Sequence, residues 1–454
     1  MEGSPDGSLI AEAKALYRAG HLAAAARLCQ SITKRQPDHW SALHLLGVIA
    51  LDRGYPGMAL RFLSAAAVLG ETPVRASLAA ALEALGRPGE ALAELAAAAA
   101  AAPTIPHYPF NRGNLLQRQG DFAGAEAAYR TALALDPGMV AAHWNLGLLL
   151  LRNGRLAEAW PEYEWRWRRP GTPVHYHIHP AWKGEEFSGR TLLLYAEQGL
   201  GDAIQFSRYL PLVAGRGGRV VLECPPELVR LFSASFPQIS ILPKGTPLPP
   251  FDLQASLPSL PAIFATTLET IPATIPYLIV PSTAEAEAVL SEAGGCLTVG
   301  LVWACSPTAL SSDRTIGLAP LAPLLGIPGV RFYSLQVGPA ARELTEGRHN
   351  ILDLSPSLRD FADTAAMVSQ LDLIISVDTA VVHLAGALAR PVWVPLPYPA
   401  DWRWLRERTD SPWYPTITLF RQTQAGGWSP VVAALAERLA SLVKTASSTG
   451  SAAQ

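Results

Sequence analysis

Small and apolar residues recur with helical spacing from the start of the chain to Arg169, and glycines interrupt them at regular intervals. These glycines are Gly20, Gly54, Gly86, Gly120 and Gly154, so successive positions differ by 34, 32, 34 and 34. An alanine follows each glycine five positions later, and another small residue precedes it by seven. Glycine readily adopts the left-handed conformation that ends a helix, and small residues let two helices cross closely. The pattern therefore predicts five helix–turn–helix units, with a glycine ending the first helix of each.

A period of about 34 residues is the signature of the tetratricopeptide repeat (TPR), whose stacked helix pairs form a solenoid with a concave groove. We therefore predict a TPR solenoid over residues 6–169, and the shorter step from Gly54 to Gly86 indicates a slightly shortened third unit. Such grooves commonly hold a peptide or protein segment, although repeats also serve as spacers or dimerisation surfaces. An ordinary alanine-rich bundle is the alternative, and the agreement among the units argues against it.

From Thr191 onward, short apolar runs alternate with amphipathic stretches. Strands are predicted at Thr191–Ala196, Arg219–Cys224, Ile239–Leu242, Leu297–Ala304, Arg331–Leu335, Leu373–Val377 and Val392–Pro397. Helices are expected between several of them, including Asp202–Ala214, Pro226–Ser235 and Leu358–Gln370. Strands that alternate with helices favour parallel sheets with helical crossovers.

A proline-rich stretch, residues 243–281, carries few helix signals and is expected to bridge two sheets. We predict two Rossmann-like α/β halves, residues 191–280 and 296–440, with a linker at 170–190 and a disordered tail at 441–454. Two such halves would form a cleft at the carboxyl ends of their strands, where open sheets bind ligands.

The segment Trp160–Arg169 is rich in tryptophan and arginine, which are favoured at buried contacts. We expect it to dock the solenoid onto the region that follows, rather than to bind nucleic acid. His175, His177 and His179 alternate just after it, as metal ligands on a strand would. A polar linker is the favoured interpretation, because no carboxylate or cysteine partner stands nearby.

The composition of the chain argues against nucleic-acid binding, membrane insertion and a cysteine metal site. The chain is 49% hydrophobic and 16% charged, and its net charge of −2 favours neither nucleic acid nor an anionic membrane. No apolar run approaches the length of a membrane span, and the polar start gives no signal-peptide pattern. The four cysteines form no CxxC pair, which suits a reducing cytoplasm and argues against a cysteine metal site.

The run Glu197–Asp202, reading EQGLGD, follows a predicted strand and opens a predicted helix. Its glycines, Gly199 and Gly201, permit close approach of the backbone, and the amides at the helix start could face a ligand. Asp202 either faces the predicted cleft or simply caps the helix.

A second strand–turn–helix runs from Ser376 to Ala387. The Thr379 hydroxyl and the amides of the turn would meet a phosphate, which the helix dipole also favours. His383 lies one turn into that helix. The equally weighted alternative makes Asp378 and Thr379 a cap and His383 a packing residue.

A third motif is a polar loop that follows the predicted strand ending near Ala304. It reads Trp303 to Pro307 and then Ser311 to Arg314. Arg314 could pair with phosphate oxygens, or it could form an ordinary surface salt bridge.

The block from Thr191 to Leu439 resembles bacterial glycosyltransferases that include the ADP-heptose:lipopolysaccharide heptosyltransferases. The resemblance rests on Gly199–Asp202 after the first strand and on Ser376–Thr379 with His383. It is strongest to a bacterial group in which TPR repeats precede the transferase domain. Three segments typical of that group are EQGLGD, SLQVGP at Ser334–Pro339, and an ending formed by Trp402–Leu405, Ser411–Pro415 and Leu419–Gln422.

The resemblance implies a GT-B fold with a nucleotide-sugar between its two halves. The transferase is expected to need no metal ion and no other cofactor. It assigns Asp202 as general base and Gln336 to a segment close to the nucleotide. The residues it implies for binding the nucleotide-sugar are Gly199, Gly201, Arg314, Gln336, Asp378, Thr379, Ala380 and His383.

The chain departs from its relatives in the third motif. They usually read Ala-Gly-Asn-Pro where this chain has Ala304-Cys305-Ser306-Pro307, and they carry a basic residue at the position of Ile316. This departure reduces the phosphate-contacting set of the loop to Arg314.

The expected function is transfer of a sugar from a nucleotide-activated donor to a protein held by the TPR groove, such as a flagellin-like or other surface protein. A helix N-terminus with Arg314 and His383 would stabilise the departing phosphate, while Asp202 takes the acceptor proton. One alternative is a non-catalytic scaffold with a degenerate transferase domain. Another is a transferase whose acceptor is lipopolysaccharide or another glycan.

Overall fold

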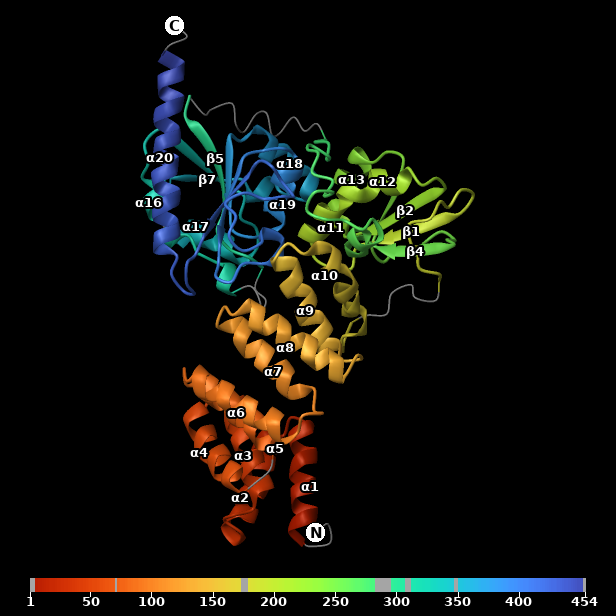
Figure 1. The fold of residues 1–454 in the computed structure, drawn as a ribbon. Coiled ribbons are helices and arrows are strands. Elements are labelled where there is room, and N and C mark those ends of the chain that lie inside the picture. Colours follow the sequence, from red (N-terminus) through yellow and green to blue (C-terminus); the bar gives the residue numbers. More distant parts are fainter. Residues whose placement is uncertain are drawn as a thin grey trace. The chain divides into compact units, whose positions relative to one another are not determined.

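The computed structural model describes residues 5–69, 72–172, 179–281, 295–306, 312–346 and 350–451. By its contacts the chain forms two compact units. The first holds residues 1–149 with 168–170, and the second holds residues 150–167 with 171–454. Figure 1 shows helices throughout the first unit and strands in the second.

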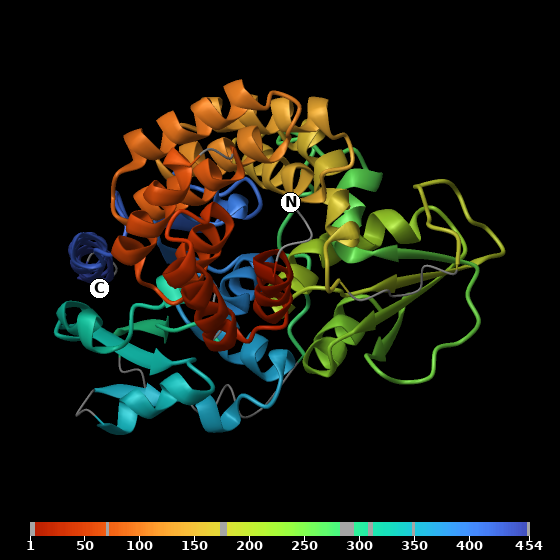
Figure 2. The same ribbon diagram turned by 90° about the horizontal axis from the view of Figure 1, so that it is seen from below.

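The repeat region consists of helix pairs. Its helices are α1 (Pro5–Arg18), α2 (Leu22–Arg35), α3 (Trp40–Asp52), α4 (Pro56–Val68), α5 (Thr72–Ala84), α6 (Pro88–Ala101), α7 (His107–Arg118), α8 (Phe122–Leu135), α9 (Val140–Arg152) and α10 (Leu156–Tyr163). Within the first unit the successive pairs follow a curved path, as Figure 2 shows. Helix α10 and the end of α9 belong to the second unit.

The turn glycines of the repeats have the predicted conformation. Their φ angles lie between 72° and 82°, in the left-handed region that glycine tolerates best. After α3, Gly54 donates its N–H to Leu51 O and Tyr55 donates to Ala50 O, so the last carbonyls of the helix are satisfied. The alanine five positions after each glycine is fully buried. The TPR solenoid predicted from the sequence is therefore confirmed.

The small residues on the first helices allow the second helices to pack closely. A Cβ atom added at Gly113 on α7 would lie 2.6 Å from Cε1 of Tyr129 on α8. Tyr129 cannot swing away cheaply, because its ring is fully buried and its hydroxyl donates to Asn114 Oδ1 at 2.9 Å. The spacing of small residues in the sequence thus records where paired helices touch.

Replacing Gly113 by alanine should destabilise the repeat region by about 1–3 kcal/mol, because the added methyl group overpacks the α7–α8 contact. Gly57→Ala is the matched control, since Gly57 lies in α4 and a Cβ there meets nothing within 4 Å. That variant should be neutral or stabilised by up to about 1 kcal/mol. Urea unfolding followed by circular dichroism measures both. Equal effects of the two substitutions would contradict the packing argument.

The first α/β lobe contains a four-stranded parallel sheet in the order β3-β2-β1-β4. Its strands are β1 (Thr191–Tyr195), β2 (Arg219–Cys224), β3 (Ser240–Pro243) and β4 (Leu253–Ser256). Its helices are α11 (Leu200–Phe206), α12 (Leu210–Ala214), α13 (Val229–Ser235) and α14 (Leu260–Ile263). The single helix expected at Asp202–Ala214 is therefore divided, by a 3-10 turn at Ser207–Tyr209.

The second lobe contains a six-stranded parallel sheet in the order β10-β9-β8-β5-β6-β7. Its strands are β5 (Leu297–Val302), β6 (Val330–Ser334), β7 (Ile351–Asp353), β8 (Leu373–Ser376), β9 (Val392–Leu396) and β10 (Ile417–Arg421). Its helices are α16 (Ala322–Leu325), α17 (Glu343–Glu346), α18 (Phe361–Gln370), α19 (Ala380–Ala387) and α20 (Ser429–Ser451). The two parallel sheets confirm the α/β, GT-B-like class.

The module has three strands that the sequence analysis did not predict, β4, β7 and β10, and a longer C-terminal helix than expected. Strand β4 forms inside the proline-rich stretch 243–281, where no strand was expected. It pairs with β1 and is buried on both faces, so it lacks the polar–apolar alternation that marks an exposed strand. Helix α20 extends to Ser451 over most of the segment predicted as a disordered tail. Its residues Leu435 and Leu439 are fully buried, and no proline interrupts the residues that follow them.

The aromatic segment 160–167 packs on the α/β lobes. The Trp160 indole N–H donates to Thr266 O at 2.7 Å, and its ring meets Trp402 edge-on at 6.0 Å. Arg166 follows in a 3-10 turn, Glu164–Arg168, and its side chain is buried. The segment is thus part of the hydrophobic and polar core of the second unit.

Candidate functional site

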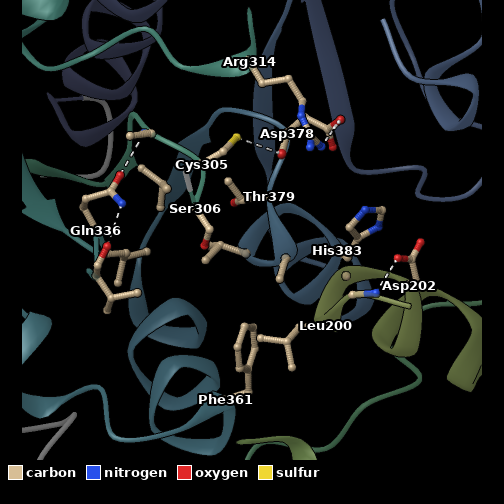
Figure 3. Close-up of a pocket in the computed structure, with 18 of the residues that line it drawn as sticks. Leu200, Asp202, Cys305, Ser306, Arg314, Gln336, Phe361, Asp378, Thr379 and His383 are labelled. Atoms are coloured by element: carbon tan, nitrogen blue, oxygen red, sulfur yellow. Dashed lines mark hydrogen bonds and ion pairs between the residues drawn. The ribbon is translucent and has the colours of Figure 1, made fainter. Parts of the chain in front are cut away.

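A pocket of about 420 Å³ opens between the two α/β lobes. It is lined by the residues that follow strands β1, β5, β6, β8 and β9, together with the start of α18. Carboxyl ends of parallel strands meet at one edge of a sheet, so each lobe presents its loops to the same space. Figure 3 shows these loops around the pocket.

Every site residue predicted from the sequence lines this pocket. They are Gly199, Gly201, Asp202, Arg314, Gln336, Asp378, Thr379, Ala380 and His383. They come from both lobes and from segments far apart in the chain, so only the fold brings them together. Their roles in binding or chemistry remain predictions. Pro307 and Ser311 of the third motif lie outside the described residues.

Helices α11 and α19 meet at the pocket through Gly201. A Cβ atom at Gly201 would lie 2.8 Å from Cδ2 of His383 and 3.5 Å from Cα of Ala380. Only a residue without a side chain permits this approach. The N-terminal ends of two helices, one from each lobe, consequently line the same cavity.

Asp202 holds the start of α11 and also forms an ion pair across the lobes. Its Oδ2 accepts the Gly199 N–H at 3.0 Å, and its Oδ1 accepts a hydrogen bond from the Arg403 guanidinium. Burial raises the pKa of Asp202 above its ordinary value, and Arg403 opposes part of that rise. Its side chain keeps 21% of its surface exposed. The capping interpretation of Asp202 is therefore correct, and the carboxylate also remains accessible from the pocket.

Arg403 joins three partners around the pocket. Besides Asp202, its guanidinium donates to Asp401 Oδ1 at 2.9 Å and to Gln205 Oε1 at 2.7 Å. Burial acts to raise the pKa of Asp401, but the charge of Arg403 outweighs it and the pKa is lowered. Asp401 and Arg403 both line the pocket, and the sequence analysis assigned neither a role.

Asp378 lies at the start of α19, close to a cation and a thiol. Its Oδ2 is 3.6 Å from Arg314 Nη1, and its backbone carbonyl accepts a hydrogen bond from the Cys305 thiol at 3.5 Å. Burial, then the nearby charge of Asp401, raises the pKa of Asp378 to about 6, although Arg314 opposes the rise. Thr379 does not cap the helix with its side chain, and instead shares a hydrogen bond with Ser376 Oγ at 3.1 Å. Arg314 therefore pairs with a carboxylate inside the pocket rather than on the open surface.

Gln336 supports the loop that follows β5. Its Oε1 accepts the backbone N–H groups of Trp303 at 3.1 Å and Ala304 at 2.9 Å, and its Nε2 donates to Val337 O at 3.0 Å. Its side chain amide is thus already bonded within the protein. Gln336 shapes the wall of the pocket through this loop.

His383 is buried between aromatic rings. Its Nδ1 is 3.0 Å from the Tyr414 hydroxyl, and its ring stacks on Trp404 with centroids 5.5 Å apart. Burial, with the positive charge of Arg403, lowers the pKa of His383 to about 3. The packing interpretation of His383 is therefore correct. Because the imidazole is neutral at neutral pH, any stabilisation of the departing phosphate by His383 would come from a hydrogen bond and not from a positive charge.

The neutral His383 should make the protein sensitive to acid. Its folded-state pKa lies below the ordinary value of 6.5, so the unfolded chain binds the extra proton and stability falls as the pH drops through 6.5. Between pH 7 and pH 5 this group should cost about 2 kcal/mol, a loss that His383→Gln should abolish. Urea unfolding at both pH values measures the difference. An identical pH dependence in both proteins would contradict the prediction.

Apolar residues from both lobes form the other end of the pocket. Figure 3 shows Leu200 and Phe361 facing each other, away from Arg314. Val337 also lines the pocket and is 54% exposed. The sequence analysis did not single out these residues, because isolated apolar side chains beside a strand or helix usually enter a core. Ile316 does so: it is buried in the core of the second lobe.

Within the described ranges, no group of three or more histidine, cysteine, aspartate or glutamate side chains is arranged to hold a metal ion. His175 and His177 lie outside those ranges. Among the helices that the structure describes, none is long and apolar enough to cross a membrane.

Comparison with known proteins gives matches in both regions. A tetratricopeptide repeat family model matches residues 10–76 and 110–170. The glycosyltransferase family 9 (heptosyltransferase) model matches residues 339–393, which contain β7, β8 and the start of α19 discussed above. Protein FlbA of Caulobacter vibrioides is 26% identical over 497 residues, covering 93% of this chain and 82% of FlbA.

Solved structures of repeat proteins resemble part of the chain. TTC0263, a TPR protein of Thermus thermophilus, is 25% identical with a TM-score of 0.34, covering 36% of this chain and 91% of its own. MamA from Desulfovibrio magneticus RS-1 is 18% identical with a TM-score of 0.33, covering 38% of this chain and 100% of its own. By the two family matches, the chain combines TPR repeats with a segment similar to glycosyltransferase family 9 (heptosyltransferase).

Proposed function

We propose that this protein transfers a sugar from a nucleotide-activated donor to a protein acceptor held by its repeats. The observation that carries the proposal is the start of α19, which opens into the pocket beside Arg314 and faces Asp202 of the other lobe. The family 9 match covers this helix start, and the TPR match provides a surface of the kind that binds protein segments.

The donor phosphates would bind at the N-terminus of α19. The helix dipole favours an anion there, and no side chain caps the helix. Arg314 adds a positive charge beside Asp378. As the bond between the sugar and the phosphate breaks, the nucleotide leaves with the electron pair. These groups would stabilise its growing charge, which is the basis for proposing a metal-independent GT-B mechanism.

Asp202 is the proposed general base. A bond forms between the anomeric carbon of the sugar and the acceptor oxygen, and the proton of that hydroxyl passes to the Asp202 carboxylate. The raised pKa of Asp202 makes it a better proton acceptor than an ordinary aspartate. Arg403 holds the carboxylate in place through its hydrogen bond. The groups that bind the donor phosphates and the base would therefore face the sugar from different lobes.

Arg314→Gln should weaken donor binding about 10- to 100-fold, since a charge-assisted contact to phosphate is lost. Isothermal titration calorimetry with a panel of nucleoside diphosphates and their sugars measures this. Arg408→Gln is the control, because Arg408 is exposed and pairs with the exposed Asp410. Equal affinities of the wild type and Arg314→Gln would exclude the assigned phosphate contact.

A non-catalytic scaffold is the competing function. It is favoured by Ile316, which is buried in a core at the position where relatives carry a basic residue. A pure scaffold should bind none of the nucleotides in the calorimetric panel.

The four cysteines are free thiols, which supports a cytoplasmic location as part of the proposal.

Mass spectrometry of surface proteins from a deletion strain tests the acceptor. Loss of a glycan mass from one protein would identify that protein as the acceptor. Loss of a sugar from a lipopolysaccharide, with every surface protein unchanged, would reject a protein acceptor.

A further inference from the structure

We propose that Arg166 is a positioning residue for the transfer site, which it orients from outside the pocket through Glu197. This inference rests on the proposed function, because it concerns the loop that carries Asp202. Arg166 comes from the turn that follows the last repeat helix and lies in the second unit with that loop. It does not line the pocket.

A buried network joins Arg166 to the loop. Its Nε donates to Glu197 Oε1 at 2.5 Å, and each of the two side chains is only 5% exposed. Its Nη2 donates to Ser259 Oγ at 2.6 Å, and Ser259 donates in turn to Glu164 Oε2 at 3.0 Å. The guanidinium also lies 4.9 Å from the Tyr163 ring centroid. These bonds fix the carboxylate of Glu197 in one orientation.

The helix before Arg166 holds the next residue of the loop as well. The Gln198 side chain amide donates to the Tyr163 hydroxyl at 2.9 Å. Gln198 precedes Gly199, whose N–H is bound by Asp202. Two consecutive residues of the loop are thus attached to the segment 163–166, immediately before the turn that presents the proposed base.

The same helix contacts the partner of the base. Tyr163 packs edge-on against Trp402 with ring centroids 6.2 Å apart, and Trp402 precedes Arg403 in the chain. Arg403 donates to Asp202. The segment ending at Arg166 therefore contacts both sides of the Asp202–Arg403 ion pair. A segment that holds both sides of a catalytic pair sets its geometry even without touching substrate.

The charge of Glu197 reaches Asp202. The charged and titratable groups that act on Asp202 are Arg403, Asp401, Glu197 and Tyr163, and His383 faces it across Gly201. Arg166 pairs with Glu197, and also with Glu164, in the wild type. Without Arg166, the Glu197 charge acts unopposed and should raise the pKa of Asp202; with Glu197→Gln, that pKa should fall.

The test uses full-length Arg166→Met and Glu197→Gln. Arg155→Met is the control. The exposed Arg155 pairs with Glu158 at the start of α10, the helix that precedes Arg166. For transfer, Arg166→Met should lower kcat at least tenfold while the donor Kd changes less than twofold. The acid limb of the pH–rate profile should move to higher pH in Arg166→Met and to lower pH in Glu197→Gln. Arg155→Met should change neither quantity.

Unchanged acid limbs in both variants, or a changed Kd with an unchanged kcat, would overturn the positioning role. If Arg166→Met does not fold, Glu197→Gln alone decides, since its amide can still accept from Arg166.

A second readout does not need transfer. The unfolding free energies of the wild type and of Asp202→Asn are measured over a range of pH. Their difference changes while Asp202 titrates, and the pH at which it becomes constant reports the pKa of Asp202 in the folded protein. That pH should rise when Arg166→Met is added to both and fall when Glu197→Gln is added. A wild type that transfers no sugar would refute the proposed function, while this readout would still decide the role of Arg166.

Discussion

Asp202→Asn is expected to lower the turnover number by about 10²- to 10⁴-fold, the usual contribution of a general base. The asparagine oxygen can still accept the Gly199 N–H, so the start of α11 should remain folded. An amide cannot take the acceptor proton, so only the chemical step should suffer. Donor Kd, measured by calorimetry, should change less than about threefold.

The control for this experiment is the melting temperature of the variant. Loss of the ion pair with Arg403 could lower it, and comparison at a temperature well below both transitions removes that effect. Transfer at the wild-type rate by folded Asp202→Asn protein would show that another group accepts the proton. The remaining pocket carboxylates, Asp378 and Asp401, would then be the next candidates.

Arg403→Met is expected to cause the largest loss of stability. It leaves Asp202 and Asp401 in the pocket without their shared cation. An unpaired charge costs about 3–5 kcal/mol when it is fully buried, and somewhat less for these partly exposed carboxylates. The loss should be largest at neutral pH and should shrink at acidic pH. Both carboxylates then become protonated, and a neutral acid needs no cation. Denaturant unfolding at several pH values measures this trend.

The exposed pair Arg408–Asp410 provides the matched comparison. Arg408→Met should change the unfolding free energy by less than about 1 kcal/mol, because exposed pairs contribute little. Arg403→Met combined with Asp401→Asn should recover part of the loss, since one of the two unpaired charges is gone. A loss in Arg403→Met that does not depend on pH would instead indicate a packing defect beside Trp402.

Local signals in the sequence were sufficient for the repeats and for most strands. Positive φ at the turn glycines and burial of the paired alanines follow from spacing alone, because each interaction lies within one repeat. Strand β4 had no such signal, because it is buried on both faces and prolines flank it. Its place is determined by pairing with β1, which precedes it in the chain by two other strands and their helices.

The site shows the same limit. Asp202 and Asp378 were recognisable because each follows a strand and opens a helix. Arg403 was not assigned, although it stands between two tryptophans, because its partners Asp202 and Gln205 belong to the other lobe. The protonation of His383 depends on its burial and on the charge of Arg403, which only the folded chain supplies. Residue types indicated the pocket, whereas charge states required the structure.

The contact boundary inside α9 has a consequence for protein engineering. By sequence period, α10 is the second helix of the fifth repeat, yet it packs into the second unit with residues 171–454. A chimera that exchanges the repeat array for another should be joined before Leu150, not at the end of the repeat sequence. Joined at residue 170, it would replace Trp160 and Arg166 and disturb their contacts with the α/β lobes. The last repeat helix is therefore, in structural terms, part of the α/β unit rather than of the repeat array.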